Sequence, residues 1–254
     1  VKDTEVDLGF RIFDRSGPRV VPTPEGVVFL DDARQTVAQF ERTIRASRQN
    51  AAGARGHIIV GYSALAASRQ ISEALDAFHR SIPGVQVEMH VMSTDNMLKN
   101  LKSGVIDLGF LLSHPTVGAP GIDQMPVWSS SIGIVTPAGE APAGVKDLDG
   151  VPFVMGLREN WRSWRALLDS ACDRANLSTV VVDEAWDVQV ILQRVAERRG
   201  VTFFPMSMAD SLPAALELAL IDGLDAEATI SMAWSTKADT SLLRQFRNHF
   251  PQLA

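Results

Sequence analysis

The sequence has 254 residues, of which 46% are hydrophobic and 21% charged, and its formal net charge at pH 7 is -6. This usage is typical of a folded globular chain and excludes a disordered or fibrous protein. No apolar run approaches the roughly 20 residues of a membrane helix, and the opening residues lack the pattern of an export signal, so we expect a cytoplasmic protein without a membrane partner.

The first 55 residues are more basic than the rest of the chain. They hold nine Lys/Arg and eight Asp/Glu, for a net charge of +1, whereas the other 199 residues hold fifteen and twenty-two, for a net charge of -7. Within the first 22 residues, Arg11, Arg15 and Arg19 surround a Ser16-Gly17-Pro18 turn, which predicts a short basic hairpin. A neutral-to-basic N-terminal piece therefore precedes an acidic body.

A long helix is expected directly after this hairpin. Thr23 is a good N-cap, and Pro24 suits the first helical position. The helix then carries apolar residues at steps of three and four, namely Leu30, Ala33, Val37, Phe40 and Ile44. This spacing predicts a coiled-coil seam that pairs subunits, although it spans only about two and a half heptads, and a helix packed on its own domain is the alternative. Small residues over 51–56 then indicate a hinge.

Strands and helices alternate from His57 onward. Strands are expected over 58–62, 85–91 and 105–112, and helices over 66–80 and 94–103. This order within about 55 residues predicts parallel strands joined by right-handed crossovers.

A second unit of the same kind begins near residue 128. The patterns predict strands over 132–135, 151–155, 179–183 and 201–204, and helices over 161–176 and 186–199. One more strand (228–234) and one more helix (241–250) follow. Two α/β lobes are the simplest interpretation, with the tail of the chain crossing back into the first lobe.

Sequence motifs of common enzymes are absent. The chain contains no GxGxxG, Walker A, HExxH or GxSxG motif, so the dinucleotide, nucleotide, zinc-hydrolase and serine-hydrolase classes lose their usual support. The five histidines are scattered, and the single cysteine, Cys172, is too little for an internal disulfide or a cysteine metal site. We interpret Cys172 as a buried structural thiol and expect no catalytic site, no metal and no cofactor.

Polar residues follow several of the predicted strands. Ser63 follows the first strand, Ser93 and Thr94 follow the second, and Ser113-His114 follow the third. The corresponding positions in the second unit are 129–131, 159–161 and Phe203. Open α/β sheets bind ligands at the carboxyl ends of their strands, where hydroxyls and free N–H groups hold a small anion. Helix capping is the alternative role for each hydroxyl.

The N-terminal residues carry a family resemblance. Residues 5–15 and 20–26 closely resemble the end of the winged helix-turn-helix in LysR-type transcriptional regulators. Residues 104–110, 147–150 and 200–205 also fall where the effector domain of that family has its markers, so the resemblance covers nearly the whole chain.

The resemblance implies an α/β fold. Two Rossmann-like sublobes, like those of type 2 periplasmic binding proteins, follow a long linker helix and the remnant of a winged helix-turn-helix. The implied segments are the wing (1–22), the linker or dimerisation helix (23–52), sublobe I (53–125), sublobe II (126–228) and a return to sublobe I (229–254).

The resemblance also implies a function. The chain is expected to be a DNA-binding regulator of transcription, a homodimer or homotetramer, whose sublobes close on a small, carboxylate-bearing effector. Operator DNA is the expected partner, and RNA polymerase is a further candidate. On the wing, Arg15 and Arg19 would contact phosphates or the minor groove, exposed arginines without a DNA role being the alternative. The expected effector contacts, led by Ser93, are Ser63, Leu65, Ser93, Thr94, Leu112, Ser130, Trp161 and Phe203.

Three features depart from the family pattern. Most of the recognition helix would precede Val1, so the given chain is not expected to bind an operator specifically. Leu65 stands where the family often has a Ser or Thr ligand, and Ser63 or the backbone is expected to substitute. Arg198 stands where a glycine is usual, which is expected to alter the helix end there.

Two other functions remain open. A stand-alone solute-binding protein would share the two lobes, but it would be exported, monomeric and without the N-terminal helix. An α/β transferase would need a catalytic cluster that the sequence does not show. Native mass at several concentrations separates the first alternative from a regulator.

Overall fold

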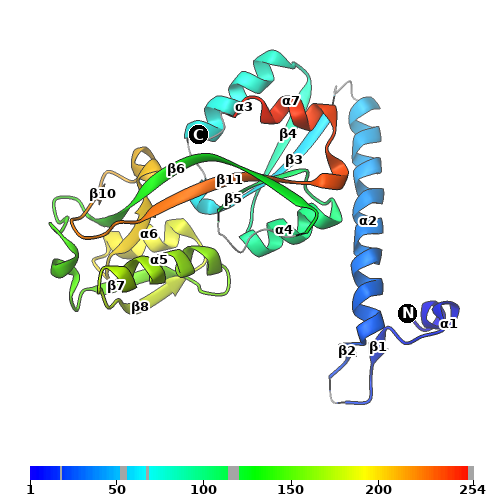
Figure 1. Ribbon diagram of the computed structural model, residues 1–254, viewed down its shortest axis with the longest axis horizontal. Coiled ribbons are helices and arrows are strands. Elements are labelled where there is room, and N and C mark those ends of the chain that lie inside the picture. The colour runs from blue at the N-terminus through cyan, green and yellow to red at the C-terminus, as the bar shows by residue number, and fades with distance from the viewer. Residues whose placement is uncertain (18, 52–55, 67–68, 114–119, 251–254) are drawn as a thin grey trace.

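A computed structural model describes residues 1–17, 19–51, 56–66, 69–113 and 120–250. Figure 1 shows a small N-terminal module, one long helix and two α/β lobes. The α-helices are α1 (Lys2–Leu8), α2 (Pro24–Ala51), α3 (Arg69–Ser81), α4 (Thr94–Ser103), α5 (Arg162–Arg174), α6 (Val188–Ala196) and α7 (Ser241–Arg247). The 3-10 helices are η1 (Ala64–Ala66), η2 (Val145–Leu148), η3 (Met206–Ser211) and η4 (Thr236–Ala238).

The strands are β1 (Phe13–Asp14), β2 (Val21–Pro22), β3 (Gly56–Tyr62), β4 (Val85–Val91), β5 (Leu108–Leu112), β6 (Ile122–Pro137), β7 (Pro152–Gly156), β8 (Val180–Ala185), β9 (Thr202–Pro205), β10 (Leu216–Ala219) and β11 (Glu227–Ser235). Most of the predicted hinge (52–55), residues 67–68 of a predicted helix, and His114 lie outside the described residues. No helix of the described part is both long and apolar enough to cross a membrane.

The N-terminal module contains one element that the sequence did not predict. The expected hairpin is confirmed, since β1 pairs antiparallel with β2, but the helix α1 precedes it. The Glu5 carboxylate joins the two, accepting hydrogen bonds from the N–H groups of Ile12 (2.8 Å) and Phe13 (3.1 Å). These N–H groups, that of Phe13 above all, lower the pKa of Glu5 because they stabilise its charged form.

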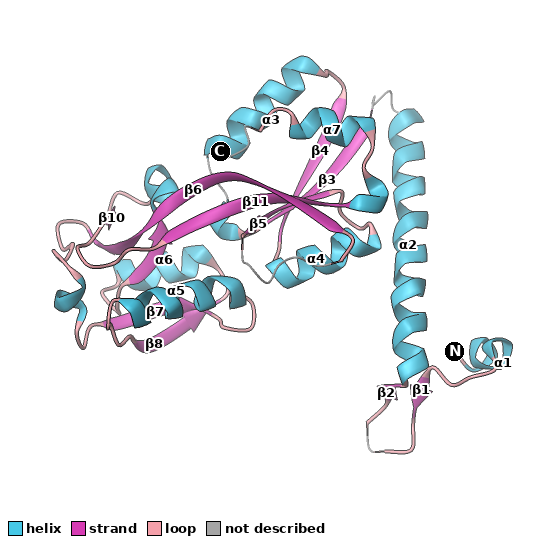
Figure 2. Cartoon of the chain, in the orientation of Figure 1, coloured by secondary structure: helices cyan, strands magenta, loops and turns pink. Residues whose placement is uncertain are grey.

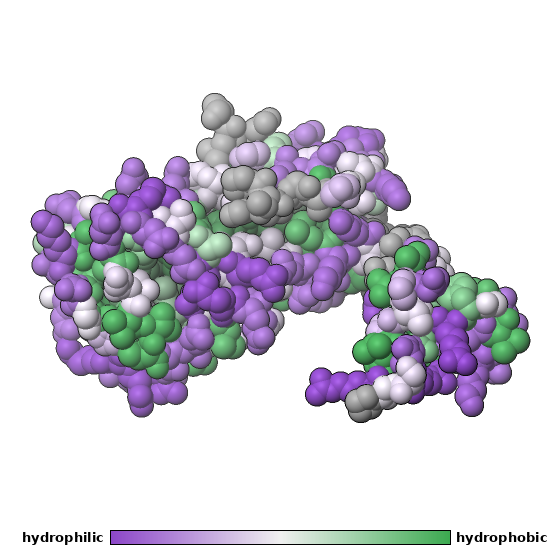
Figure 3. All heavy atoms as spheres, turned by 60° about the horizontal axis from the view of Figure 1, so that its bottom comes forward, coloured by the Kyte–Doolittle hydropathy of each residue, from purple (hydrophilic) through white to green (hydrophobic). Residues whose placement is uncertain are grey.

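The long helix α2 begins as predicted. The Thr23 hydroxyl accepts a hydrogen bond from the Gly26 N–H (2.9 Å), which satisfies one of the free donors of the first turn. A side chain at Gly26 would meet the Ile12 carbonyl oxygen at 1.9 Å, so this glycine lets the hairpin lie against the helix. Along the helix Val37 and Phe40 are 57% and 66% exposed, and Figure 3 shows apolar residues on the surface of this part of the molecule.

Sublobe I is a sheet covered on both faces (Figure 2). The strand order β11-β5-β3-β4 has the parallel arrangement predicted for β3, β4 and β5, and β11 joins antiparallel. Successive side chains of β3 enter different cores, because strand side chains alternate between faces. Ile58 and Val60 belong to the core that includes Phe78 of α3, whereas Ile59 packs with the buried residues of α4.

Two long antiparallel strands, β6 and β11, connect the sublobes. The sequence predicted only 132–135 as a strand here, and that prediction was too short, because β6 continues through Pro126. The register between β6 and β11 shifts at Ile230 and Ser231, next to this proline, and a bulge tolerates a residue that lacks an N–H. The expected segment boundaries at 125/126 and 228/229 fall inside β6 and β11. Towards the end of the chain, β11 pairs with β5 and so lies in the sheet of sublobe I.

Sublobe II contains β7 to β10, α5 and α6. β7 pairs parallel with β8, and β9 and β10 pair antiparallel with β6. The short strand β10 was not predicted. α6 ends at Ala196, and Arg198 just after it adopts φ +60, the left-handed conformation that favours glycine. Arg198 therefore takes the backbone conformation that a glycine would take, and the expected change of the helix end does not occur. The predicted α/β fold with two sublobes is confirmed.

Candidate functional site

A cavity lies between the two sublobes, at the carboxyl ends of β3, β4 and β5. Sublobe I contributes the residues after these strands, and sublobe II contributes the start of α5 and the residue after β8. The lining residues are Ser63, Ala64, Leu65, Val91, Met92, Ser93, Thr94, Asp95, Leu112, Asn160, Trp161, Arg162, Ser163, Trp164 and Trp186. Six of the eight expected effector contacts therefore line one cavity.

The wall from sublobe I combines apolar side chains with an unsatisfied hydroxyl. Leu65 and Leu112 are buried, with exposed fractions of 6% and 5%. The Ser63 N–H donates to the Phe110 carbonyl (3.0 Å), which holds this residue at the end of β3. The Ser63 hydroxyl is buried and has no hydrogen-bond partner among the described residues. A buried hydroxyl without a hydrogen-bond partner lowers the stability of the protein. A ligand that forms a hydrogen bond to Ser63 would remove this cost.

Ser93 caps a helix and also lies in the cavity wall. It is the N-cap of α4, and its hydroxyl accepts a hydrogen bond from the Asn96 N–H at 3.4 Å. It also lines the cavity together with Thr94, the first residue of the helix. The 3.4 Å distance is long for a hydrogen bond, so the capping interaction is weak and leaves the hydroxyl able to meet a ligand.

The wall from sublobe II is formed largely by tryptophan side chains. Trp161, Trp164 and Trp186 line the cavity, and the Trp161 indole N–H donates to the Trp186 carbonyl at 2.9 Å. The Trp161 ring stacks on Phe204, with ring centres 6.3 Å apart. The ring also occupies the space that a side chain at Gly156 would need, since an added Cβ there would lie 2.2 Å from the ring. The indole is thus held in one orientation at the edge of the cavity.

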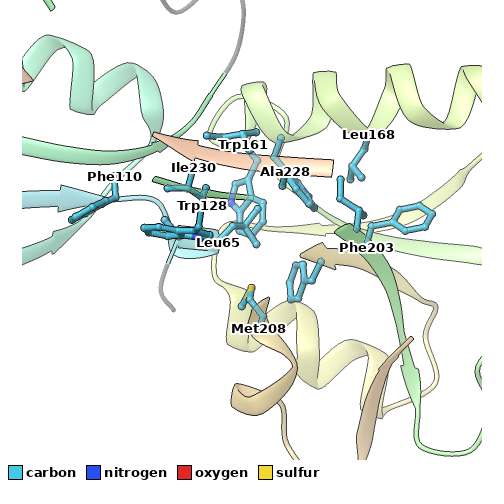
Figure 4. Packing of buried hydrophobic residues seen from close by; sticks show 14 of the residues in the cluster. Leu65, Phe110, Trp128, Trp161, Leu168, Phe203, Met208, Ala228 and Ile230 are labelled. Carbon is cyan, nitrogen blue, oxygen red and sulfur yellow. The ribbon is translucent and has the colours of Figure 1, made fainter. Parts of the chain in front are cut away.

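Ser130 and Phe203 lie outside the cavity lining. The Ser130 hydroxyl accepts a hydrogen bond from the Ser207 N–H (2.8 Å), which joins β6 to η3. Phe203 is fully buried and stacks on Phe153 with ring centres 5.1 Å apart. Figure 4 shows Phe203 on the side of Leu168, within sublobe II. The sequence placed both residues near strand ends, but Phe203 lies within β9 rather than after it, and its side chain packs into the core of sublobe II.

Several lining residues were not identified from the sequence. They are Asp95, Arg162, Trp164 and Trp186, together with the neighbouring positions Ala64, Val91, Met92 and Ser163. Trp186 directly follows β8, so the strand-end rule that identified Ser63 would also have found it. Nothing in the sequence indicates that Asp95 and Arg162, 67 positions apart, face the same cavity.

The side chains expected to contact DNA or a second subunit are exposed at the surface. Arg15 forms an ion pair with Glu5 (3.5 Å), and Arg19 lies exposed in the hairpin loop. On α2 the five residues of the predicted seam, Leu30, Ala33, Val37, Phe40 and Ile44, are all partly or largely exposed. These side chains are therefore accessible to a partner.

No group of three or more potential metal-binding side chains occurs within the described ranges. The histidines are nevertheless less scattered than the sequence indicated. The carboxylate of Glu88 in β4 lies 3.1 Å from the Nε2 atom of His57 in β3 and 2.6 Å from the Nε2 atom of His90 in β4.

Cys172 is expected to be unreactive in the folded protein. Its side chain is buried within α5, and burial raises the pKa of the thiol to about 11. Because the thiolate is the nucleophile, a pKa this high leaves very little of it at pH 8. Reaction with a thiol reagent at pH 8 should therefore be slow in buffer and rapid in denaturant. Fast labelling of the native protein would contradict this assignment.

The chain is similar to known proteins in both sequence and fold. The family model described as LysR substrate binding domain matches residues 51–254. The HTH-type transcriptional regulator TfdS of Cupriavidus pinatubonensis is 26% identical over 247 residues, which are 95% of this chain and 83% of that protein.

Two solved structures illustrate the shared fold. Full-length CbnR in complex with its target DNA superposes with a TM-score of 0.74 at 22% identity, covering 98% of this chain and 86% of that one. The effector binding domain of QuiR in complex with shikimate superposes with a TM-score of 0.66 at 15% identity, covering 76% of this chain and 94% of that one.

Proposed function

This chain belongs to the LysR family of transcriptional regulators, and we propose that its sublobes sense a small metabolite that bears a carboxylate. In this proposal the metabolite binds in the cavity between the sublobes. Binding favours one arrangement of sublobes or subunits over another, and this shift of a pre-existing equilibrium is the signal.

The observation that carries the proposal is the convergence of helix starts on one cavity. The first residues of η1, α4 and α5 all line it, and the beginning of a helix presents unpaired N–H groups that favour an anion. Trp161, the N-cap of α5, makes no side-chain capping hydrogen bond. The three tryptophans supply the apolar, aromatic surface on which the body of a small organic ligand packs.

The remaining parts of the proposal concern assembly and DNA. The exposed seam on α2 would pair two subunits, and pairs of dimers would make a tetramer. Arg15 and Arg19 would contact DNA phosphates or the minor groove in a protein that carries the rest of the winged helix-turn-helix. CbnR, with a similar fold, was solved with its target DNA.

RNA polymerase would be a partner in activation, and the cytoplasm would be the compartment. The solute-binding alternative finds no support among relatives that are regulators.

A thermal-shift screen of aromatic and aliphatic carboxylates tests the proposed ligand class. A ligand at about 100 times its dissociation constant should add ~2.7 kcal/mol to the free energy of unfolding. The Ser93→Ala variant should lose most of this response, because the substitution removes a hydroxyl from the cavity wall. Thermal midpoints with and without ligand, together with titration calorimetry, measure the effect.

Thr240→Ala is the matched control. Thr240 caps α7 through its hydroxyl (3.3 Å to the Leu243 N–H), as Ser93 caps α4, but it does not line the cavity. Both variants should lose about 1 kcal/mol of intrinsic stability. Only Ser93→Ala should lose the ligand response, and an equal response in both variants would sink the placement of the site. If no carboxylate stabilises the parent protein, the proposed ligand class is wrong.

A further inference from the structure

Two opposite charges face each other across the cavity. Among the described lining residues, Asp95 and Arg162 are the ones that carry a formal charge. Asp95 lies in the first turn of α4 in sublobe I, and Arg162 is the first residue of α5 in sublobe II. The Arg162 Nη1 atom is 3.6 Å from the Asp95 Oδ2 atom. The pair therefore joins the two sublobes at the cavity and leaves the described lining neutral overall.

This pair contributes little to the stability of the fold. The two side chains are 71% and 47% exposed, and exposed ion pairs are worth about 0–1 kcal/mol. The separation of 3.6 Å is also longer than a charge-assisted hydrogen bond. The sublobes are instead held together by the continuous strands β6 and β11. The Arg162–Asp95 contact can therefore be exchanged for another at small cost.

Arg162 occupies a position that does not favour a cation. The N-terminus of a helix carries a partial positive charge, which attracts anions and repels cations. The first turn of α5 contains no acidic residue that would offset Arg162. Asp95, in contrast, lies in the first turn of α4, where a carboxylate is favourable. Helix stability thus explains Asp95 but not Arg162.

Two other arginines near the start of α5 have closer partners than Arg162 has. Arg158 forms an ion pair with Asp169 at 2.7 Å. Arg165 is buried and bonds to Glu184 (2.6 Å) and to the Gly156 carbonyl (2.9 Å). Neither of these arginines lines the cavity. Arg162 combines a place in the lining with a weakly held charge, so it is the guanidinium available to a ligand.

We propose that Arg162 selects an anionic ligand and that Asp95 is its internal competitor. This inference rests on the proposed function of the cavity. The Asp95 carboxylate holds the guanidinium in the absence of ligand, and the carboxylate of the ligand replaces it on binding. A guanidinium binds a carboxylate with two parallel hydrogen bonds, which are stronger than the single long contact to Asp95. A neutral ligand of the same shape cannot make this exchange.

The mechanism makes the two residues act in opposite directions. Removing Asp95 frees Arg162 and takes a negative charge away from the incoming carboxylate, so binding of an anion should strengthen. Removing Arg162 leaves Asp95 to repel the anion, so binding should weaken. A merely structural bridge between the sublobes would behave differently, because loss of either partner would then have the same effect.

The experiment measures dissociation constants of matched acids and amides. The probes are benzoate with benzamide, cyclohexanecarboxylate with its amide, and succinate with succinamide. They are titrated into the 254-residue parent, Asp95→Asn, Arg162→Gln and the double variant. Arg158→Gln is the control, since it removes an arginine from the same region outside the cavity. Circular dichroism and thermal midpoints of the ligand-free variants show that each is folded.

The parent should prefer an acid over its amide by about tenfold or more, the worth of hydrogen bonds to a charged group. Asp95→Asn should bind the acid about two- to fivefold more tightly, the worth of an exposed ion pair. Arg162→Gln should lose most of the preference for the acid over the amide, and Arg158→Gln should keep it. The double variant should lack the preference for the acid as Arg162→Gln does, but it should bind the acid more tightly than Arg162→Gln, because Asp95 no longer repels it.

Each remaining outcome overturns the inference alone or overturns it together with the proposed function. If the parent binds an acid and Arg162→Gln keeps the full preference for it, the inference on Arg162 is overturned while the proposed ligand class stands. If Asp95→Asn weakens binding of the acid, competition is overturned and the pair is a structural bridge. If neither the parent nor Asp95→Asn binds any acid, the proposed function of the cavity fails and the inference fails with it.

Discussion

The Val37→Asp variant is expected to be a monomer at concentrations where the parent chain is a dimer or larger. Val37 is 57% exposed at the centre of the α2 seam. If this seam pairs two subunits, the substitution would place a carboxylate at an interface that excludes water, where an unpaired charge is strongly unfavourable. The dissociation constant of the dimer should rise by about 100-fold or more, which is ~2.7 kcal/mol. Sedimentation velocity over a range of concentrations measures it.

Val28→Asp is the matched control for this experiment. It introduces the same charge on the same helix, at a residue that is 63% exposed on the opposite face from the seam. The dimer should persist in this variant, and both variants should retain the helical signal of the parent. A Val37→Asp protein that stays dimeric, or a parent that is monomeric at every concentration, would show that α2 does not pair subunits through this seam.

The Phe203→Ala variant is expected to lose about 3–5 kcal/mol of stability without a specific loss of ligand binding. Phe203 is fully buried, and its ring stacks on Phe153 in the core of sublobe II. Truncating a buried phenylalanine removes apolar contacts and leaves a cavity that the surrounding side chains fill only in part. Urea denaturation monitored by circular dichroism measures the loss.

Phe203→Leu separates a core residue from a ligand contact. Leucine retains much of the buried volume, so this variant should remain folded, and its affinity for a carboxylate found by the screen should stay within about twofold of the parent value. A loss of tenfold or more in a stably folded Phe203→Leu protein would restore Phe203 as an effector contact. It would also imply that the ligand enters deeper into sublobe II than the cavity reaches.

Local patterns predicted the secondary structure closely where their signals were strong. The helix over 94–103 and the strand over 85–91 were predicted with the bounds that the structure has. Hydrophobic alternation and the capping hydroxyl of Ser93 are properties of a few consecutive residues, so they can be recognised without the fold. The strand β6 was predicted too short because its pairing partner, β11, lies about 100 residues further along the chain.

The sequence predicted only part of the candidate site, because some of its positions follow from local patterns and others depend on distant contacts. The rule that ligands bind at the carboxyl ends of parallel strands identified Ser63, Ser93 and Thr94, because strand ends can be read from the sequence. The rule placed Phe203 near the ligand as well, but Phe203 lies inside β9, and its side chain faces the core, where it stacks on Phe153. Which positions of a buried strand meet the core depends on the elements packed against it, and no short stretch of sequence contains that information.

The sequence by itself determined the order of the elements, the α/β class, the apolar seam of α2 and, through residues 5–26, the resemblance to the LysR family. Only the tertiary structure decided how the sublobes meet, which brings Asp95 and Arg162 to 3.6 Å across one cavity. The physical reason is the range of the interactions. Helix periodicity and capping act within about four residues, whereas sheet register and the packing of one sublobe against another depend on contacts between distant parts of the chain.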